Sequence, residues 1–242
     1  MIRRIINGIY GATAVQKSLK AVSGNAYRGL LLPLGYRGPY MVLPGEYCLL
    51  AGIFNSSTVH SFSSTVGQSG RVVVAEANPK NVERMKGELA ELSNIRLLAN
   101  AIWNAQGTMD FIASDGDESG YDRLASDELN EYPERMGLTA LSVPVPTNTI
   151  DHLVEEHLDG RVDHINLTIN GAELQALDTI DAVIANNPGV RIYINSEIPV
   201  PGDEVIVKLR QLGFRVYTSK LIRVHNKSIR LIRIYAYLKK RN

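Results

Sequence analysis

Two hydrophobic patterns alternate along most of this 242-residue chain. Short, nearly continuous apolar runs are typical of strands that are buried on both faces of a sheet. The strands predicted in this way are 47–53, 71–75, 95–99, 108–113, 164–169, 190–196, 214–218, 221–224 and 229–238. Apolar residues at helical spacing separate most of these runs. The predicted helices are 56–65, 79–92, 149–157, 172–185 and 203–212.

This alternation of strands and helices predicts an α/β fold with a mostly parallel, seven-stranded sheet that helices cover on both faces. Two helix starts support the prediction. Asn78 followed by Pro79 is a favoured N-cap and first helical residue, and Thr149 is a second N-cap. The last two strands follow each other directly through a turn at 225–228, so we expect an antiparallel hairpin to close the sheet.

The first 41 residues differ from the rest of the chain. Residues 1–20 have apolar side chains at helical spacing, and residues 21–47 are rich in Gly, Pro and Tyr. We therefore expect an N-terminal helical extension over 1–41 and an α/β domain over 42–242. The basic, amphipathic segment 1–20 could lie on an anionic membrane. The alternative is a helix that packs across the domain.

The formal net charge of +1 hides a strong segregation of charge along the chain. Residues 1–50 carry six Lys and Arg and one acidic residue, and residues 51–202 carry nine and twenty-two. Residues 203–242 carry eleven and two. Such asymmetry indicates either an anionic partner or basic ends that fold back onto the acidic middle. The basic C-terminal residues lack interleaved aromatic side chains, so the sequence does not favour nucleic-acid binding.

Composition and motifs exclude several classes of protein. The single cysteine, Cys48, excludes internal disulfides and a Cys-rich zinc site. The five histidines show no metal-ligand spacing, so no metal site is expected. No apolar run reaches the roughly 18 residues of a spanning helix. We therefore expect a cytoplasmic protein, with peripheral membrane contact through residues 1–20 as an open alternative.

Candidate chemistry lies where the predicted strands end, because open α/β sheets bind ligands beyond the carboxyl ends of their strands. Glu76 is the most specific residue there, since it ends a continuous apolar strand and a capped helix follows. A ribose offers two neighbouring hydroxyl donors, and a fixed carboxylate can accept both. The alternative is an acid that caps the next helix or forms a salt bridge.

Short motifs in a fixed order resemble those of a known family. They are Leu43–Glu46, Gly67–Arg71, Glu76–Pro79, Asn100–Ala101, Gly107–Thr108, Val143–Pro146, Thr149–Asp151 and Asn170–Leu174. Over roughly residues 42–217, the chain resembles FkbM-type methyltransferases, which belong to the S-adenosylmethionine (SAM)-dependent, Rossmann-like class. The resemblance implies a class I methyltransferase fold and SAM-dependent methyl transfer, which we expect to go to oxygen of a small molecule or glycan.

The resemblance also implies roles for individual residues. Tyr121 and Asn170 would face the substrate. Glu197 lies just past a strand, where the family often carries an acid, and is the expected catalytic general base. Its alternative role is a structural carboxylate that meets Arg191 or the basic C-terminal segment. The residues expected to bind the cofactor are Gly52, Glu76, Ala77, Asn100 and Ala101.

The chain departs from the family at two strand ends. Leu50 replaces an acid that normally helps to hold the amino-acid end of SAM, and Ser56 replaces a second glycine. Asn166, Thr168 and Asn170 replace a lysine, an aspartate and a glutamate. Either the protein still binds SAM and holds its substrate without those charges, or it is a catalytically inactive scaffold or partner-binding protein. The sequence specifies neither the methyl acceptor nor the oligomeric state, and a homo-oligomer stays open.

Overall fold

The main sheet contains all of the strands that the apolar runs predict except 108–113, which lies in a second sheet. In the computed structural model they are β1 (Tyr47–Ala51), β2 (Arg71–Glu76), β3 (Ile95–Ala99), β8 (His164–Leu167), β9 (Arg191–Glu197), β10 (Phe214–Thr218), β11 (Ile222–Val224) and β12 (Ile229–Leu238). The structure describes residues 42–238 apart from 54, 115–121, 126–139, 198–201, 219–221 and 225–228. The expected N-terminal extension, its membrane-binding segment and the turn at 225–228 lie outside the described residues.

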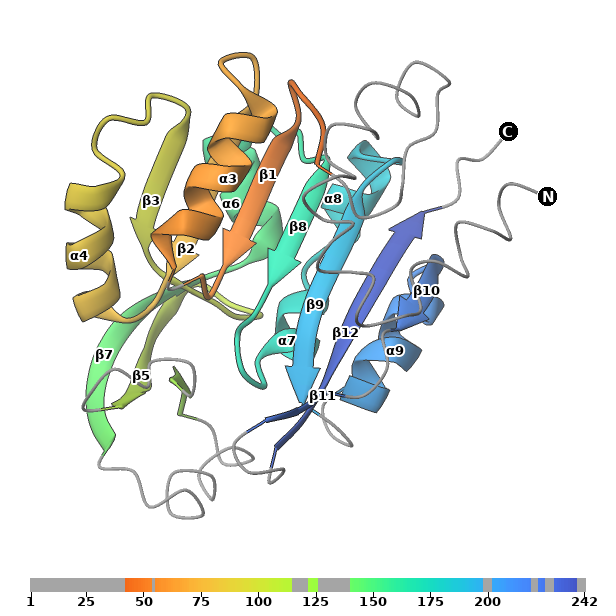
Figure 1. The fold of residues 1–242 in the computed structure, drawn as a ribbon. Coiled ribbons are helices and arrows are strands. Elements are labelled where there is room, and N and C mark those ends of the chain that lie inside the picture. The colour runs from red at the N-terminus through yellow and green to blue at the C-terminus, as the bar shows by residue number, and fades with distance from the viewer. Residues whose placement is uncertain are drawn as a thin grey trace. The chain divides into compact units, whose positions relative to one another are not determined.

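Strand pairing confirms the predicted topology. Seven strands lie in the order β10-β12-β9-β8-β1-β2-β3, and β11 also pairs with β12. The pairs from β9 to β3 are parallel, whereas β12 is antiparallel to β9, β10 and β11. This arrangement is the Rossmann-like class I methyltransferase fold, with an antiparallel C-terminal hairpin (Figure 1).

Two cores lie on the two faces of the sheet, because successive side chains of a strand point in opposite directions. Leu49 and Ala51 of β1 face α6 (Ile150–Leu158), α7 (Glu173–Leu177), α8 (Asp181–Asn186) and α9 (Gly202–Gln211). Cys48 and Leu50 face α3 (Ser56–Val66) and α4 (Pro79–Glu88) on the other side. Figure 1 shows α3 and α4 over β1, β2 and β3, with the other helices behind the sheet.

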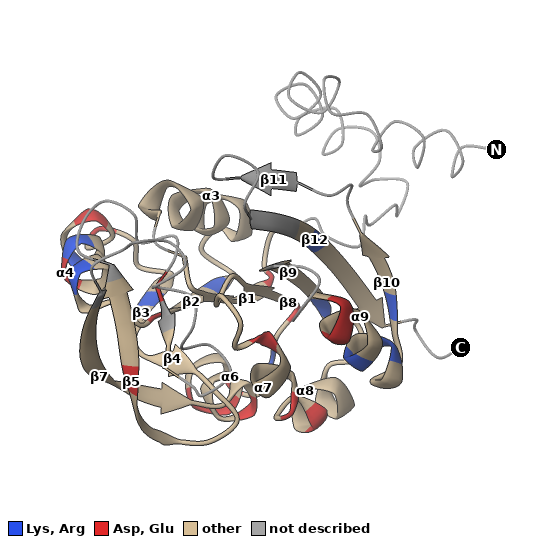
Figure 2. Ribbon diagram, turned by 90° about the horizontal axis from the view of Figure 1, so that it is seen from below, with Lys and Arg blue, Asp and Glu red and all other residues tan. Residues whose placement is uncertain are grey.

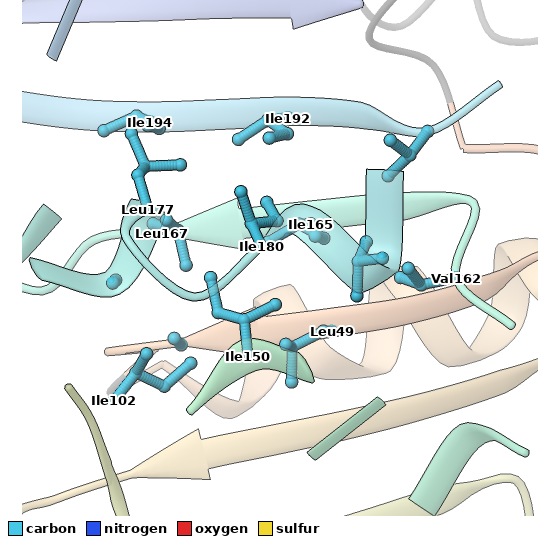
Figure 3. Close-up of a cluster of buried hydrophobic side chains, with 14 of the residues drawn as sticks. Leu49, Ile102, Ile150, Val162, Ile165, Leu167, Leu177, Ile180, Ile192 and Ile194 are labelled. Carbon is cyan, nitrogen blue, oxygen red and sulfur yellow. The ribbon is translucent and has the colours of Figure 1, made fainter. Parts of the chain in front are cut away.

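The larger core consists of apolar side chains that are almost completely buried. Leu49 of β1, Ile165 of β8 and Ile192 of β9 are at most 1% exposed. Figure 3 shows them beside Ile150 of α6 and Ile180, which precedes α8. Burial of one such side chain contributes about 1.5–3 kcal/mol to stability. The core therefore holds β1, β8 and β9 in fixed register.

Helix starts follow the capping signals of the sequence. The side chain of Asn78 accepts a hydrogen bond from the Lys80 amide at 2.8 Å, and Pro79 opens α4. Thr149 Oγ1 accepts from the His152 amide at 3.2 Å and caps α6. These side chains satisfy amides that have no partner inside the helix.

One predicted helix is wrong in its extent. The segment 172–185 forms two short helices, α7 and α8, rather than one. The carboxylate of Asp151 in α6 accepts from the amides of Ala182 at 3.2 Å and Val183 at 3.0 Å. This contact satisfies the N-terminus of α8, so a tertiary interaction favours a new helix start that local periodicity does not show.

Charges on α9 complement its helix dipole. Asp203 and Glu204 lie in the first turn, and Lys208 and Arg210 lie in the last turn. In Figure 2 the ribbon of this helix is red (Asp, Glu) toward one end and blue (Lys, Arg) toward the other. Each acid near a helix N-terminus and each base near its C-terminus stabilises the helix by about 0.3–1 kcal/mol. No described helix has both the length and the apolar character needed to cross a membrane.

A second, four-stranded sheet was not predicted. Its strands are β4 (Ala101–Ile102), β5 (Gly107–Ser114), β6 (Arg123–Leu124) and β7 (Ala140–Asn148), in the order β4-β7-β5-β6. Pro144 and Pro146 argue against a strand at β7, because proline has no backbone N–H to donate to a neighbouring strand. The two prolines are two residues apart, so the positions without an N–H group face the same edge of β7. One edge of β7 pairs with β5 along its length, whereas the other pairs with β4 only at Thr147–Asn148, so the prolines are tolerated.

Polar side chains are also buried on the face that carries α3. Arg191 of β9 donates to the Glu46 carboxylate at 2.5 Å, and both residues are largely buried. His164 of β8 is 2% exposed and packs against Phe62 of α3 with the ring centroids 5.7 Å apart. Burial, and secondarily the positive charge of Arg191, lower the pKa of His164 to about 3.

Leu49→Ala should lower the free energy of unfolding by about 2–5 kcal/mol, because it leaves a cavity in the middle of the larger core. Urea denaturation followed by circular dichroism measures this change. The control Leu141→Ala removes the same atoms from a side chain of β7 that is 46% exposed. It should change the free energy by less than about 0.5 kcal/mol. Equal losses in the two variants contradict the position of the core.

His164→Phe should weaken the pH dependence of stability. In the unfolded chain, the imidazole has a pKa of about 6.5 and binds a proton below that pH. In the folded protein its pKa is about 3, so between these two values only the unfolded chain is protonated at this residue. Stability is therefore fully present above that unfolded value and falls as the pH is lowered toward 3. Urea unfolding at pH 7 and pH 5 should show a smaller loss in the variant, by roughly 2 kcal/mol. Identical losses contradict a buried neutral imidazole.

Candidate functional site

The carboxyl ends of β1, β2, β3 and β8 meet at one edge of the main sheet, as parallel pairing requires. In Figure 1 these ends point toward the hairpin formed by β5 and β7. The segments that follow the strands carry most of the candidate residues. Glu76 is the last residue of β2, and Asn100 and Ala101 follow β3. Asn170 follows β8 after a short loop.

Glu76 is buried at this edge. The residue is 4% exposed. Its carboxylate oxygen Oε1 accepts hydrogen bonds from the Asn78 amide at 2.8 Å and from Asn81 Nδ2 at 3.5 Å. Burial raises the pKa of Glu76, and the nearby charge of Asp122 adds to the increase. Hydrogen bonds from Asn78, Asn81 and Ala77 lower the pKa and partly offset burial. The helix-capping alternative for Glu76 is thus realised in part, since the carboxylate binds the amide of the N-cap residue.

A chain of hydrogen bonds joins the ends of β2 and β8. Asn78 Nδ2 donates to Asp122 Oδ2 at 2.6 Å, and Asn170 Nδ2 donates to the Asp122 backbone carbonyl at 2.8 Å. Asp122 directly precedes β6 and is 7% exposed. Sequence reasoning placed Asp122 beside Tyr121 in the long acidic segment 114–140, where a substrate lid would be expected, but gave Asp122 no role of its own. Its neighbour Tyr121, the expected substrate residue, lies outside the described residues.

Three predicted cofactor residues lie next to Glu76. The Asn100 amide donates to the Glu76 backbone carbonyl at 3.0 Å. Ala101 belongs to an apolar cluster formed mainly by residues of the second sheet, and the partly buried Ala77 packs against this cluster. The other members of this cluster include Phe111, Leu124, Val145 and Ala172. Asn100 Oδ1 is buried without a hydrogen-bond partner among the described residues. The arrangement therefore combines a carboxylate, an unused acceptor and apolar surface.

Gly52 has a steric role that the sequence did not reveal. Its φ is +68°, and an added Cβ would lie 2.0 Å from the Thr168 carbonyl oxygen. Its amide donates to the Ala75 carbonyl at 3.0 Å, and the Thr168 amide donates to the Ala51 carbonyl at 3.0 Å. The glycine lets the ends of β1 and β8 approach closely, and its positive φ ends β1 at Ala51 rather than at Ile53.

The first two departures from the family pattern, Leu50 within β1 and Ser56 after it, are both buried. Leu50 is 0% exposed and lies in the core beneath α3 and α4. Ser56, the first residue of α3, donates its hydroxyl to the Glu88 carboxylate of α4. Leu50 therefore has no group that could bind an ammonium, and Ser56 ties the two helices together.

The departures near β8 lie in different environments. Asn166 is 8% exposed, and its Oδ1 has no hydrogen-bond partner in the described part of the chain. Thr168 contributes backbone contacts to the end of β1. Asn170 has a φ of +47°, in the left-handed region that Asn tolerates better than most residues. Glu197 ends β9, but its side chain is not among those described, so its catalytic role stays a prediction.

Comparison with known proteins gives a family and a set of similar folds. The Methyltransferase FkbM domain matches residues 42–216. No curated protein matches the chain. A precorrin-6y C5,15-methyltransferase from Geobacter metallireducens has 14% identity and a TM-score of 0.47, covering 83% of this chain and 84% of that one. A SAM-dependent methyltransferase from Aquifex aeolicus has 16% identity and a TM-score of 0.41, covering 82% and 85%.

Gly52→Ala should lower the free energy of unfolding by roughly 2–5 kcal/mol, because it combines left-handed backbone strain with overlap of the Thr168 carbonyl. The control Gly67→Ala has a φ of +66° but no atom within 4 Å of the added Cβ. With a ψ of −169°, Gly67 lies in a region that is almost confined to glycine, so this variant should cost about 1–3 kcal/mol of backbone strain without the added overlap. Urea denaturation of both variants measures the difference, and equal costs contradict the close approach of β1 and β8.

Proposed function

Because the chain belongs to the FkbM methyltransferase-domain family, we propose that it is a SAM-dependent methyltransferase whose cofactor binds at the carboxyl ends of β2 and β3. One observation carries this proposal. At that edge the buried Glu76 carboxylate ends β2 and Asn100 follows β3, with its backbone amide donating to the Glu76 carbonyl at 3.0 Å, and Asn100 Oδ1 is a buried acceptor with no hydrogen-bond partner among the described residues. A buried acceptor without a partner costs about 1–3 kcal/mol, which a ligand donor can recover.

The residues at this edge fit the nucleoside part of SAM. The Glu76 carboxylate can accept from the two ribose hydroxyls, and Asn100 Oδ1 can accept from the exocyclic amine of adenine. The partly buried Ala77 offers apolar surface to the base, and the buried Ala101 supports it from the apolar cluster. Ligand sites commonly combine apolar walls with a few placed polar groups.

The amino-acid end of SAM must be held differently from the family pattern. Leu50 cannot bind the ammonium group, because it is apolar and fully buried. Glu76 and Asn100 would therefore carry most of the polar recognition. When bound, SAM supplies an electrophilic methyl group, and the residues of this chain orient the cofactor and its acceptor. Since methyl transfer depends mainly on alignment of the two, it tolerates this change.

On the acceptor side, we propose Tyr121 and Asn170 as substrate residues and Glu197 as the general base that takes a proton from an acceptor hydroxyl. The position of Asn170 after β8, joined to Asp122, supports this assignment. The family resemblance supports O-methylation of a small molecule or glycan. We further propose a cytoplasmic location, with residues 1–20 as the segment that contacts anionic membranes.

A second function is favoured by one specific observation. Leu50, in place of the family's acid, is part of the core beneath α3 and α4. A chain that had lost SAM binding could retain the fold as a scaffold or partner-binding protein. Cofactor binding separates the two functions.

Calorimetry with SAM should show binding to the full chain, and Glu76→Gln should weaken it by about 1–3 kcal/mol, since one ribose hydroxyl then lacks an acceptor. Asn100→Ala should weaken binding by a similar amount. Glu83→Gln is the matched control, because this α4 carboxylate pairs with Lys86 on the exposed surface. It should leave the affinity unchanged. Absence of both heat and a thermal shift at millimolar SAM would favour the scaffold function.

A further inference from the structure

Asp122 connects two parts of the protein that are distant in sequence. The strand that follows it, β6, pairs with β5, with Phe111 opposite Leu124, and the Ala125 amide donates to the Asp110 carbonyl at 2.7 Å. The backbone of Asp122 is therefore anchored to the second sheet. Its side chain and carbonyl instead contact residues that follow strands of the main sheet.

The first contact fixes Asn78. The Asn78 side chain accepts from the Lys80 amide and donates to Asp122 Oδ2, so both ends of its amide are engaged. A hydrogen bond from an amide to a charged carboxylate is stronger than one between neutral groups. The Asn78 backbone amide in turn donates to Glu76 Oε1. Asp122 thus acts on the orientation of Glu76 through Asn78.

The second contact fixes Asn170 in a left-handed conformation. The side-chain amide of Asn170 donates to the Asp122 carbonyl at 2.8 Å. An ionised carboxylate at this position, as the family resemblance would lead one to expect, could not donate this bond and would place a second acceptor next to the Asp122 carbonyl oxygen. Asn at position 170 is therefore the residue that can bond to Asp122, whereas the family's acid could not.

We propose that Asp122 is a positioning residue for methyl transfer, which holds Glu76 on the cofactor side and Asn170 on the acceptor side in one fixed arrangement. The inference rests on the proposed SAM-dependent function and adds to it a residue that couples the two sides. Asp122 does not itself need to touch the cofactor. Its effect is transmitted through the Asn78 and Asn170 side chains.

The charge of Asp122 gives this role a readout that packing alone would not change. Glu76 must be ionised to accept both ribose hydroxyls, so SAM binding is lost as the pH falls through the pKa of Glu76. The groups that act on this pKa are Asp122, which precedes β6, and the donors Ala77, Asn78 and Asn81 before and within the first turn of α4. Removal of the Asp122 charge lowers the pKa of Glu76, so the acid limit of binding moves to lower pH.

The test is calorimetry of the full chain with SAM between pH 4 and pH 8. Asp122→Ala removes the Asn78 contact and should weaken binding at pH 7 by about tenfold. Asp122→Asn keeps the size and one acceptor oxygen but removes the charge. It should bind within about threefold of wild type at pH 7 and retain binding to lower pH. The matched control Asp110→Asn changes an exposed acid of β5 and should leave affinity and pH profile unchanged.

Urea unfolding of each variant separates loss of fold from loss of positioning. If Asp122→Ala does not fold, the pH profile of the isosteric Asp122→Asn decides. Folded variants with the affinity and pH profile of wild type overturn the role of Asp122 while the proposed function stands. Absence of SAM binding to the wild-type chain overturns the proposed function and this inference together.

Discussion

Burial of the Glu76 carboxylate is the constraint around which the candidate site is organised. An unpaired carboxylate is costly to remove from water, and burial raises the pKa of this one. The groups that offset the cost come from the start of α4, where the Asn78 amide and the Asn81 side chain donate to Oε1. The positive end of the α4 dipole adds to the stabilisation. The carboxylate is thereby kept buried at the end of β2, where we propose that the ribose hydroxyls bind.

The two halves of the expected cofactor site have different fates in this chain. At β2 and β3, the chain keeps the buried Glu76 carboxylate and the buried acceptor Asn100 Oδ1, which has no hydrogen-bond partner among the described residues. At β1, Leu50 has joined the core and Gly52 serves the close approach to Thr168. The fold needs Gly52 whether or not a ligand binds, so that glycine by itself is weak evidence of function. Function therefore depends on Glu76 and Asn100 more than on the glycine motif.

Much of the fold could be predicted because it depends on local patterns. Buried strands have apolar runs, and Asn78 and Thr149 are caps that act within one helical turn. Features that depend on distant contacts were missed or mispredicted. The start of α8 depends on Asp151, 31 residues earlier, and Asp122 meets Asn78 across 44 residues. In the same way, the sequence placed Glu76 correctly at a strand end but could not show which donors surround it.

A crystal structure of the full chain with S-adenosylhomocysteine, the demethylated form of the cofactor, tests the central claim most directly. We expect the ribose hydroxyls at about 3 Å from the Glu76 carboxylate and the adenine amine at a similar distance from Asn100 Oδ1. A nucleoside bound elsewhere would contradict the site. Crystals grown at millimolar ligand that show no nucleoside, with Glu76 still bound only to Asn78 and Asn81, would contradict SAM binding itself.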